Sequence, residues 1–224
     1  MKAYKLTAQD FTTNYGTLWG ENLTHKIAPE KRETVLCADA WLHFYCDPLI
    51  AVLMNPAHAN IKKPILWESE AEGEILHEPL KSGCKILTTI KQIPLPEISK
   101  LQKIAFGILC AKEIYENTMW QKWADNWLNN VDRTAKSAAI ASKSAISATD
   151  NAAADTAAKS AATGATNAAY AASIDAAYAA GATSIDAATA YIASSVAADA
   201  ACIATKHELI INFVKLAQKA LTIK

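Results

Sequence analysis

Proline is missing from the sequence after Pro96, and the same stretch contains only three glycines, Gly107, Gly164 and Gly181. These are the two residue types that most oppose an α-helix, so their scarcity removes the usual helix breakers from more than half of the chain. All seven prolines lie in the first hundred residues. This asymmetry divides the chain into an N-terminal part rich in turns and a C-terminal part that favours helix.

The sequence also lacks net charge, because 22 Lys and Arg residues balance 22 Asp and Glu residues. Neither half of the chain is strongly basic or acidic. Proteins that bind nucleic acid or an anionic membrane through electrostatics carry an excess of basic residues. We therefore expect no nucleic-acid partner and no membrane partner.

Long apolar runs are absent as well. No window reaches roughly 18 uninterrupted apolar residues, which is the length a membrane-spanning helix needs. The first residues, MKAYKLTAQDF, lack the apolar region of a secretory signal. The five cysteines are odd in number and irregularly spaced, without the close pairs of a zinc site. These features predict a cytoplasmic protein with reduced thiols and no metal.

Alanine is what the C-terminal part does contain, from about residue 135 to residue 205. Eleven-residue blocks start at an alanine each time, at Ala157, Ala168, Ala179, Ala190 and Ala201. Eleven residues in three turns correspond to 3.67 residues per turn, which is typical of a nearly straight α-helix. An alanine side chain buries little area, at about 25 cal/mol per Å². We therefore expect these helical segments to pair closely with each other or with a second copy of the chain.

The repeat is compatible with two arrangements, one continuous helix or a hairpin bundle of shorter helices. Gly164 and Gly181 are each followed by residues that resemble a helix end and a new helix start. The eleven-residue phase nevertheless passes through both glycines without a slip, and a turn has no reason to preserve it. The phase therefore favours a continuous helix, with the hairpin bundle as the alternative.

The N-terminal part has the patterns of a mixed α and β module. Residues 2–7 alternate as in a strand, and residues 64–76 and 84–96 predict two further strands joined by a turn around Gly83. Asp47 and Pro48 have the residue types of an N-cap and a first helical position. They predict a short helix that starts at Pro48 and ends at Pro56.

After Pro96 the apolar residues follow helical spacing. Within this segment Trp120, Trp123 and Trp127 are spaced i, i+3 and i+7, which places them on one helix face. We expect this face to dock on the N-terminal module, and the alternative is a partner-binding patch. The fold class is therefore α+β, with a module at 1–96, an amphipathic connecting helix at 97–133 and an alanine-rich helical scaffold at 134–224.

Common catalytic motifs are absent, since the sequence contains no P-loop, GxGxxG, GxSxG or HExxH pattern. Glu68, Glu70, Glu72 and Glu74 recur at every second residue and so share one face of the predicted strand. The next predicted strand carries two cations on one face, Lys85 and Lys91. Cross-strand pairs with these lysines explain such a row of glutamates without a function.

Two arrangements of reactive residues are considered. Cys37 and Cys46 flank His43, and a cysteine and a histidine make a nucleophile and base only where they meet in space. The Glu68-x-Glu70 pair resembles that of ADP-ribosyltransferases, in which such a pair positions the nicotinamide ribose and the acceptor. This resemblance implies an enzyme that uses Glu68, Glu70 and His43, with NAD as its cosubstrate.

A second resemblance covers more of the chain. Residues 37–43 (CADAWLH), 46–49 (CDPL), 72–74 (EGE) and 81–84 (KSGC) precede an alanine-rich tail. This pattern resembles an uncharacterised family found in phages and mobile elements, whose members join a small N-terminal β-rich module to alanine-rich helices. The family implies no catalytic residue and no cofactor.

These observations lead to one preferred hypothesis and two alternatives. The preferred one is a non-enzymatic phage or prophage accessory protein, in which a module that binds a host protein is carried by a helical scaffold that forms a homo-oligomer. The first alternative is the ADP-ribosyltransferase. The second is an ice-binding helix, although the threonines do not keep one phase of the repeat and therefore do not form a flat face.

Overall fold

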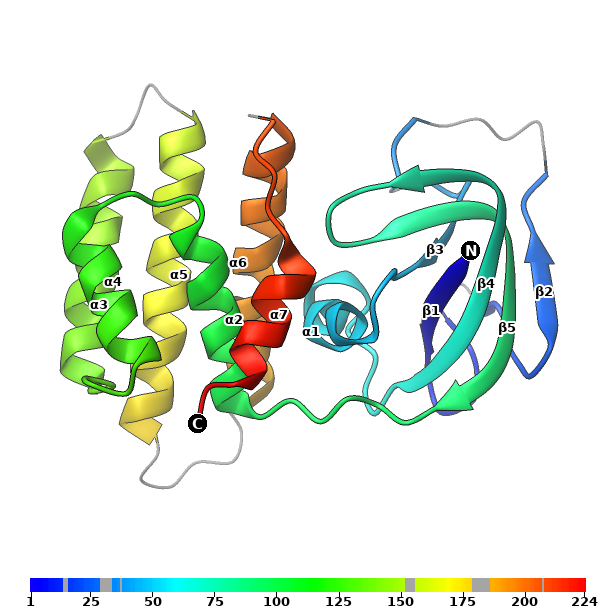
Figure 1. Cartoon of the computed structure of the whole chain (residues 1–224), viewed down its shortest axis with the longest axis horizontal. Helices are drawn as coiled ribbons and strands as arrows, with labels where there is room; N and C mark the ends of the chain where they lie inside the picture. Colours follow the sequence, from blue (N-terminus) through cyan, green and yellow to red (C-terminus); the bar gives the residue numbers. More distant parts are fainter. Residues whose placement is uncertain (14–15, 29–33, 37, 152–155, 179–185, 207) are drawn as a thin grey trace. The chain divides into compact units, whose positions relative to one another are not determined.

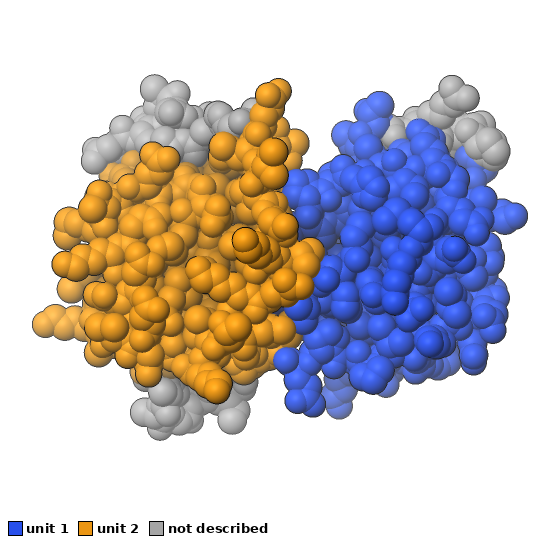
Figure 2. All heavy atoms as spheres, in the orientation of Figure 1, with its two compact units in different colours: residues 1–97 blue, residues 98–224 orange. Residues whose placement is uncertain are grey.

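The computed structural model describes residues 1–13, 16–28, 34–36, 38–151, 156–178, 186–206 and 208–224. The chain forms two compact units, Met1–Glu97 (unit 1) and Ile98–Lys224 (unit 2), which Figure 2 distinguishes by colour. Unit 1 contains an antiparallel sheet and unit 2 is helical, so the mixed α+β class predicted from the sequence is confirmed. The predicted segments 97–133 and 134–224 lie in one unit from Ile98 onward.

The sheet of unit 1 has two long central strands that form a hairpin (Figure 1). Its strands are β1 (Lys2–Thr7), β2 (Leu23–Lys26), β3 (Leu42–Phe44), β4 (Ile65–His77) and β5 (Ser82–Ile93). β1 pairs with β4, β4 pairs with β5, and β2 and β3 both pair with β5. The three predicted strands are found, as β1, β4 and β5, although β5 ends at Ile93 and not at residue 96. The turn predicted around Gly83 is wrong, because Gly83 lies inside β5 and the chain turns between Glu78 and Lys81.

A backbone bridge links the end of β3 to β1. The amide of Tyr4 donates to the carbonyl of Tyr45 and the amide of Tyr45 donates to the carbonyl of Tyr4, both at 2.8 Å. Because β3 also pairs with β5, this bridge closes the sheet around its inner face and protects two strand edges. The inner face carries the buried cluster Ala3, Trp19, Phe44, Ala71, Cys84 and Leu87.

Helix α1 (Pro48–His58) begins as predicted. The carboxylate of Asp47 accepts hydrogen bonds from the amides of Leu49 at 2.8 Å and Ile50 at 3.3 Å, and Pro48 is the first helical residue. The predicted end at Pro56 is wrong, because the helix continues to His58. A proline in the last turn removes only the bond of its own missing N–H, so the helix extends by two residues before it ends.

Unit 2 is a bundle of helices (Figure 1). Its helices are α2 (Lys100–Lys112), α3 (Thr118–Leu128), α4 (Ala135–Asn151), α5 (Thr156–Tyr178), α6 (Asp186–Lys206) and α7 (Phe213–Leu221). α5 packs against α4 and α6, and α3 packs against α4. α2 packs against α3, α5, α6 and α7 and is therefore the central helix.

The continuous alanine-rich helix favoured by the repeat is wrong. α4 and α5 lie side by side, as do α5 and α6, so the chain folds back on itself. Folding back covers the alanine faces within one chain, which a single straight helix leaves in water. Gly164, a predicted helix end, lies inside α5, and Gly181 lies outside the described residues.

Close helix packing, the other expectation from alanine, is confirmed within the chain. A Cβ atom placed on Gly107 of α2 would lie 3.2 Å from the Cα atom of Ala193 on α6. The hydroxyl of Ser142 on α4 donates to the carbonyl of Thr166 on α5 at 3.3 Å. Small side chains therefore let the backbones of neighbouring helices approach each other.

The predicted connecting helix is instead two helices. α2 ends at Lys112, and the side chain of Asn117 accepts from the amide of Trp120 at 3.0 Å to start α3. Nor does the tryptophan face dock on the N-terminal module as expected. The indole of Trp120 donates to the carbonyl of Ala165 on α5 at 3.1 Å, so the alanine-rich bundle is the surface it packs on.

Candidate functional site

The candidate site lies between α3 and α4, which form an α-helical hairpin. Asn130 turns the chain after α3 with a positive φ of 57°. The carboxylate of Asp132 accepts from the amide of Thr134 at 2.9 Å and from its hydroxyl at 2.8 Å. The hydrogen bond from the Thr134 amide is the main cause that lowers the pKa of Asp132. The polar turn therefore holds the two helices in a defined pairing.

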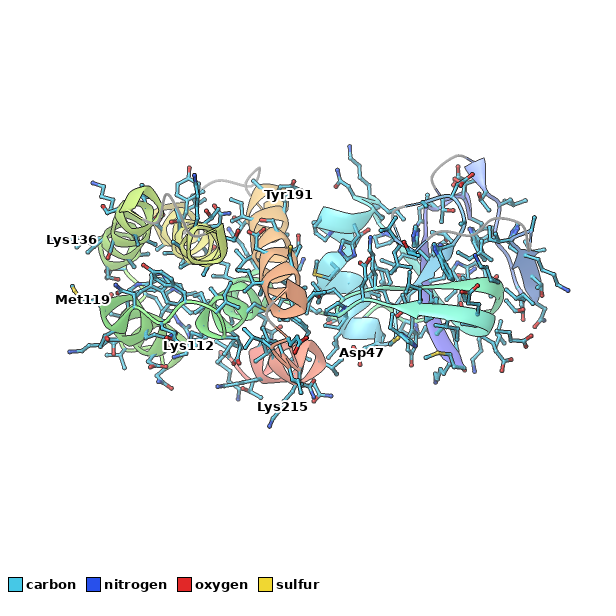
Figure 3. The ribbon with its side chains drawn as sticks, turned by 90° about the horizontal axis from the view of Figure 1, so that it is seen from above. Asp47, Lys112, Met119, Lys136, Tyr191 and Lys215 are labelled. Atoms are coloured by element: carbon cyan, nitrogen blue, oxygen red, sulfur yellow. The ribbon has the colours of Figure 1, made fainter. Side chains whose placement is uncertain are left out.

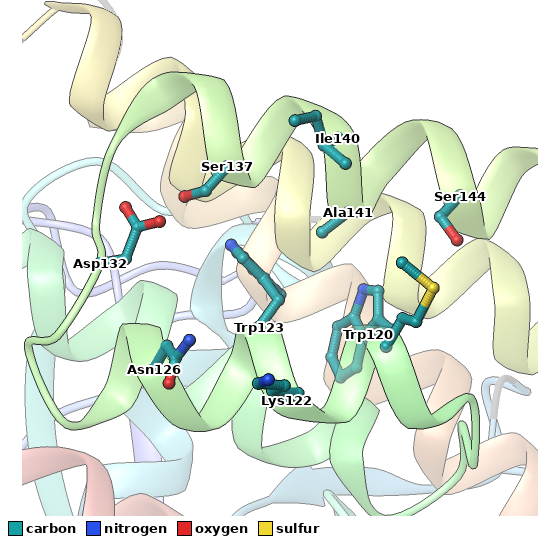
Figure 4. Close-up of a pocket in the computed structure, with 10 residues that line it drawn as sticks. Trp120, Lys122, Trp123, Asn126, Asp132, Ser137, Ile140, Ala141 and Ser144 are labelled. Atoms are coloured by element: carbon teal, nitrogen blue, oxygen red, sulfur yellow. The ribbon is translucent and has the colours of Figure 1, made fainter.

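A cavity of about 240 Å³ opens between the two helices (Figure 4). Both helices and the turn between them contribute to its walls. The lining residues are Met119, Trp120, Lys122, Trp123, Asn126, Asp132, Ser137, Ile140, Ala141 and Ser144. Two indole rings and several apolar side chains thus face a space rimmed by Lys122 and Asp132.

Large apolar side chains beside the cavity are exposed to solvent. Met119 is 74% exposed and Ile140 is 56% exposed, although both line the cavity. Figure 3 shows Met119 projecting outward from α3. Exposed methionine and isoleucine beside buried tryptophans form an apolar patch of the kind that marks interaction surfaces.

The indole nitrogens of the two cavity tryptophans differ in their hydrogen bonding. Trp120 donates to Ala165, whereas the buried Nε1 of Trp123 has no hydrogen-bond partner among the described residues. The ring nitrogen of Trp123 is drawn on the side of Ser137 and Asp132 in Figure 4. A buried donor without an acceptor costs about 1–3 kcal/mol. The N–H group of Trp123 is therefore an unsatisfied hydrogen-bond donor next to the cavity.

The third residue of the predicted patch is placed elsewhere. Trp127 does not line the cavity, and its ring lies 4.8 Å from the guanidinium of Arg133. Arg133 also donates to the Trp127 carbonyl at 2.8 Å. Trp127 is buried, with 2% of its surface exposed, and its contacts hold the end of α3. The structure therefore brings Trp120 and Trp123 into one site and leaves Trp127 outside it.

The residues of the alternative enzyme hypothesis lie in unit 1. Glu68 and Glu70 are on β4, and β1 runs between β4 and the residues after β3. The carboxylate of Glu68 lies 3.5 Å from the ammonium of Lys2. The Nε2 atom of His43 is hydrogen-bonded to the carbonyl of Leu36. Burial lowers the pKa of His43. Within the described residues no hydrogen bond or ion pair joins His43 to either glutamate.

The cations expected opposite the glutamate row divide between two roles. Lys91 is the register partner of Glu68, as expected from the alternation. Lys85 donates to the carbonyl of Ala40 at 2.9 Å and lies 3.8 Å from the centre of the Trp41 ring. The ion pair of Glu68 is with Lys2, which comes from the other neighbouring strand.

A second histidine, His58, is half-buried at the C-terminal end of α1. The hydroxyl of Tyr45 and Nδ1 of His58 are 3.3 Å apart, and their rings stack with centroids 5.9 Å apart. Burial lowers the pKa of His58 to about 4 and raises the pKa of Tyr45 above its usual range. Both groups are therefore neutral at neutral pH, and the pair is a hydrogen-bonded contact and not a charged one.

Metal ligands do not gather in the part of the chain that the structure describes, where no group of three His, Cys, Asp or Glu side chains is placed to hold an ion. Cys37 lies outside that part.

One described stretch, Ala188–Thr205 of α6, has the length and apolar composition of a membrane span, and 56% of it is buried inside the protein. Core helices of bundles satisfy the same test.

Comparison with known proteins returns no match to a family model, to a curated protein or to a solved structure.

Sequence patterns found part of this site. The helical spacing of Trp120 and Trp123 identified one wall of the cavity. Met119 and Ile140 were missed because they lie on two helices that the sequence presented as unrelated segments. The pairing of α3 with α4 is the missing information, because it brings Met119 and Ile140 to one cavity.

Proposed function

We propose that this chain is a non-enzymatic binding protein that uses the cavity between α3 and α4 to hold a protein partner. The observation that carries this proposal is the exposure of Met119 and Ile140 beside the indoles of Trp120 and Trp123. Tryptophan, methionine and other large apolar residues are the usual energetic anchors of protein interfaces. The phage or prophage setting and the homo-oligomer remain part of this proposal.

The size of the cavity favours a protein side chain over a free small molecule. Its volume is about 240 Å³. Pockets that hold small-molecule ligands usually measure about 300–1,000 Å³, and they enclose most of the ligand. A single large side chain from a partner needs less space and uses the surrounding apolar rim for further contact. We therefore propose an apolar anchor residue on the partner.

The charged rim suits an anchor that is followed by polar groups. Lys122 and Asp132 both line the cavity, so the rim offers one cation and one anion. Charges at the rim of an interface contribute more to orientation and association rate than to affinity. The anchor then supplies most of the affinity, and the rim sets its direction.

Photo-crosslinking tests this proposal. A benzophenone amino acid is placed at Ile140 in the full chain, and the protein is irradiated in lysate of the cell that expresses it naturally. Adducts at Ile140 are expected, and Met119→Glu in the same chain should abolish them because it puts a charge on the apolar patch. Met119 is 74% exposed, so this substitution leaves the fold intact.

Ile146 provides the matched control. It is also an isoleucine on α4, it is 47% exposed, and it does not line the cavity. A benzophenone at Ile146 should give no adduct that depends on Met119. An adduct with twice the mass of the chain identifies a second copy as the partner, and equal labelling from both positions contradicts the proposal.

A further inference from the structure

Three reactive side chains of unit 1 meet at the start of β5. Cys46 lies between β3 and α1, His77 is the last residue of β4, and Ser82 is the first residue of β5. Ser82 is the register partner of His77 across the hairpin and of Phe44 on β3. This double pairing brings the cysteine and the histidine to opposite sides of one serine.

The contacts form a continuous hydrogen-bonded line. The Sγ atom of Cys46 is 3.4 Å from the Oγ atom of Ser82, and Nδ1 of His77 is 2.9 Å from the same oxygen. The hydroxyl has one proton. When it donates to Nδ1 of His77, its oxygen accepts from the thiol of Cys46. Ser82 is buried, whereas Cys46 and His77 are exposed to solvent.

We propose that Cys46 is an acyl acceptor that takes an acyl group from a thioester, with Ser82 and His77 as the relay that removes its proton. The thiol proton moves to Oγ of Ser82 while the hydroxyl proton moves to Nδ1 of His77. The sulfur then attacks the thioester carbonyl, one C–S bond forms and the original C–S bond breaks. The departing thiolate recovers a proton through the same relay, so the exchange involves no oxidation.

Thioesters are the fitting substrate class because of what surrounds the thiol. The amides of Leu49 and Ile50 at the start of α1 are already bonded to Asp47, so they are occupied and do not stabilise an oxyanion. A less reactive ester or amide needs such stabilisation. A thioester has a better leaving group, and its exchange with a thiol requires chiefly the thiolate.

The other cysteines provide the comparison. Cys84 and Cys110 are buried, and burial raises the pKa of the Cys84 thiol to about 11 and the pKa of Cys110 above its usual range. Cys202 on α6 is exposed and has no hydrogen bond from its sulfur among the described residues. It therefore reports the reactivity of an exposed thiol without a relay in the same molecule.

The test uses the full chain with the acetyl thioester of N-acetylcysteamine at neutral pH. Peptide mass spectrometry then follows acetylation of Cys46 and Cys202 over time. Cys46 should be acetylated faster by about a hundredfold or more, which is the low end of general-base assistance. Equal rates at neutral pH overturn the proposal.

Two variants separate the relay from a purely structural contact. His77→Asn keeps an acceptor for the Ser82 hydroxyl but cannot take its proton, and Ser82→Ala breaks the line. Both should lower the Cys46 rate to that of Cys202, while circular dichroism checks that each variant is folded. If His77→Asn retains the wild-type ratio, the three residues only join β5 to the loop before α1, and the relay is rejected.

Discussion

At the scale of single residues, the most unusual group is the ammonium of Lys5. In the β1–β4 register Lys5 follows Ala3 by two residues, so it points to the inner face of the sheet. Its Nζ donates to the carbonyl of His43 at 2.8 Å and lies 4.8 Å from the centre of the Trp19 ring. Burial lowers the pKa of Lys5 to about 8. No carboxylate accompanies it among the described residues.

This burial makes stability depend on pH. The unfolded chain holds the Lys5 proton up to the ordinary lysine pKa of 10.5, whereas the folded chain releases it near a pKa of about 8. Below the lower value both states are protonated, and burying the charge costs about 3 kcal/mol. Between the two values the unfolded state binds more protons, so the contribution of Lys5 to stability rises with pH.

We therefore expect Lys5→Met to stabilise the protein at neutral pH by about 1–2 kcal/mol, after subtracting the lost hydrogen bond to His43. The advantage should disappear near about pH 10, because the wild-type lysine is then neutral when folded. Urea denaturation at both pH values measures the difference. Lys26→Met, at an exposed position on β2, should show no such dependence on pH. A constant effect of Lys5→Met at both pH values contradicts the burial of the charge.

At the scale of elements, unit 2 depends on helices that approach each other closely. Buried alanines occur on each long helix, including Ala138 on α4, Ala165 on α5 and Ala197 on α6. α2 fits among these helices where Gly107 faces Ala193. Each alanine contributes little burial on its own, and the dense contact between neighbouring backbones supplies the remainder through dispersion.

Two glycine substitutions should therefore have opposite effects. Gly107→Leu pushes α2 away from α6, because even a Cβ atom would lie 3.2 Å from the backbone of Ala193, and we expect a loss of about 1–3 kcal/mol. Gly164→Ala places its Cβ at ordinary distances, 3.6 Å or more, from neighbouring side chains. It should stabilise α5 by about 0.5–1 kcal/mol through helix propensity. Chemical denaturation followed by circular dichroism measures the change in the free energy of unfolding for both variants. If Gly107→Leu also stabilises the protein, the close approach of α2 to α6 does not restrict the size of residue 107.

At the scale of the whole molecule, the chain divides into two units with separate cores. Unit 1 buries residues on the inner face of its closed sheet, and unit 2 buries the faces of α2 to α7 against each other. A unit with its own core is able to fold alone. The division falls between Glu97 and Ile98, after the two prolines that follow β5.

We expect residues 98–224, expressed alone, to keep a helical circular-dichroism spectrum and to melt cooperatively. Residues 1–97 should likewise melt in one transition, since all the strand pairings described for the sheet lie within this range. Thermal melts of both fragments and of the full chain provide the measurement. A non-cooperative melt of 98–224 contradicts the assignment of a separate core. Light scattering on the same fragment tests the proposed self-association.

The features that follow from the sequence without a structure are local ones. The cap at Asp47, the strands β1, β4 and β5, and the helical nature of the alanine-rich part depend on neighbouring residues, and short-range physics selects them. The close approach of alanine faces was also predictable, since a methyl group gains burial only against a nearby partner.

The tertiary structure decided which partners these elements have. The repeat keeps its phase whether the chain runs on or folds back, and only burial within one chain distinguishes the two outcomes. For the same reason Trp120 was assigned to the wrong neighbour, and Met119 and Ile140 were not recognised as parts of one cavity. The line from Cys46 through Ser82 to His77 likewise arises from pairing between strands, because residues distant in sequence meet only when the register of the sheet is set.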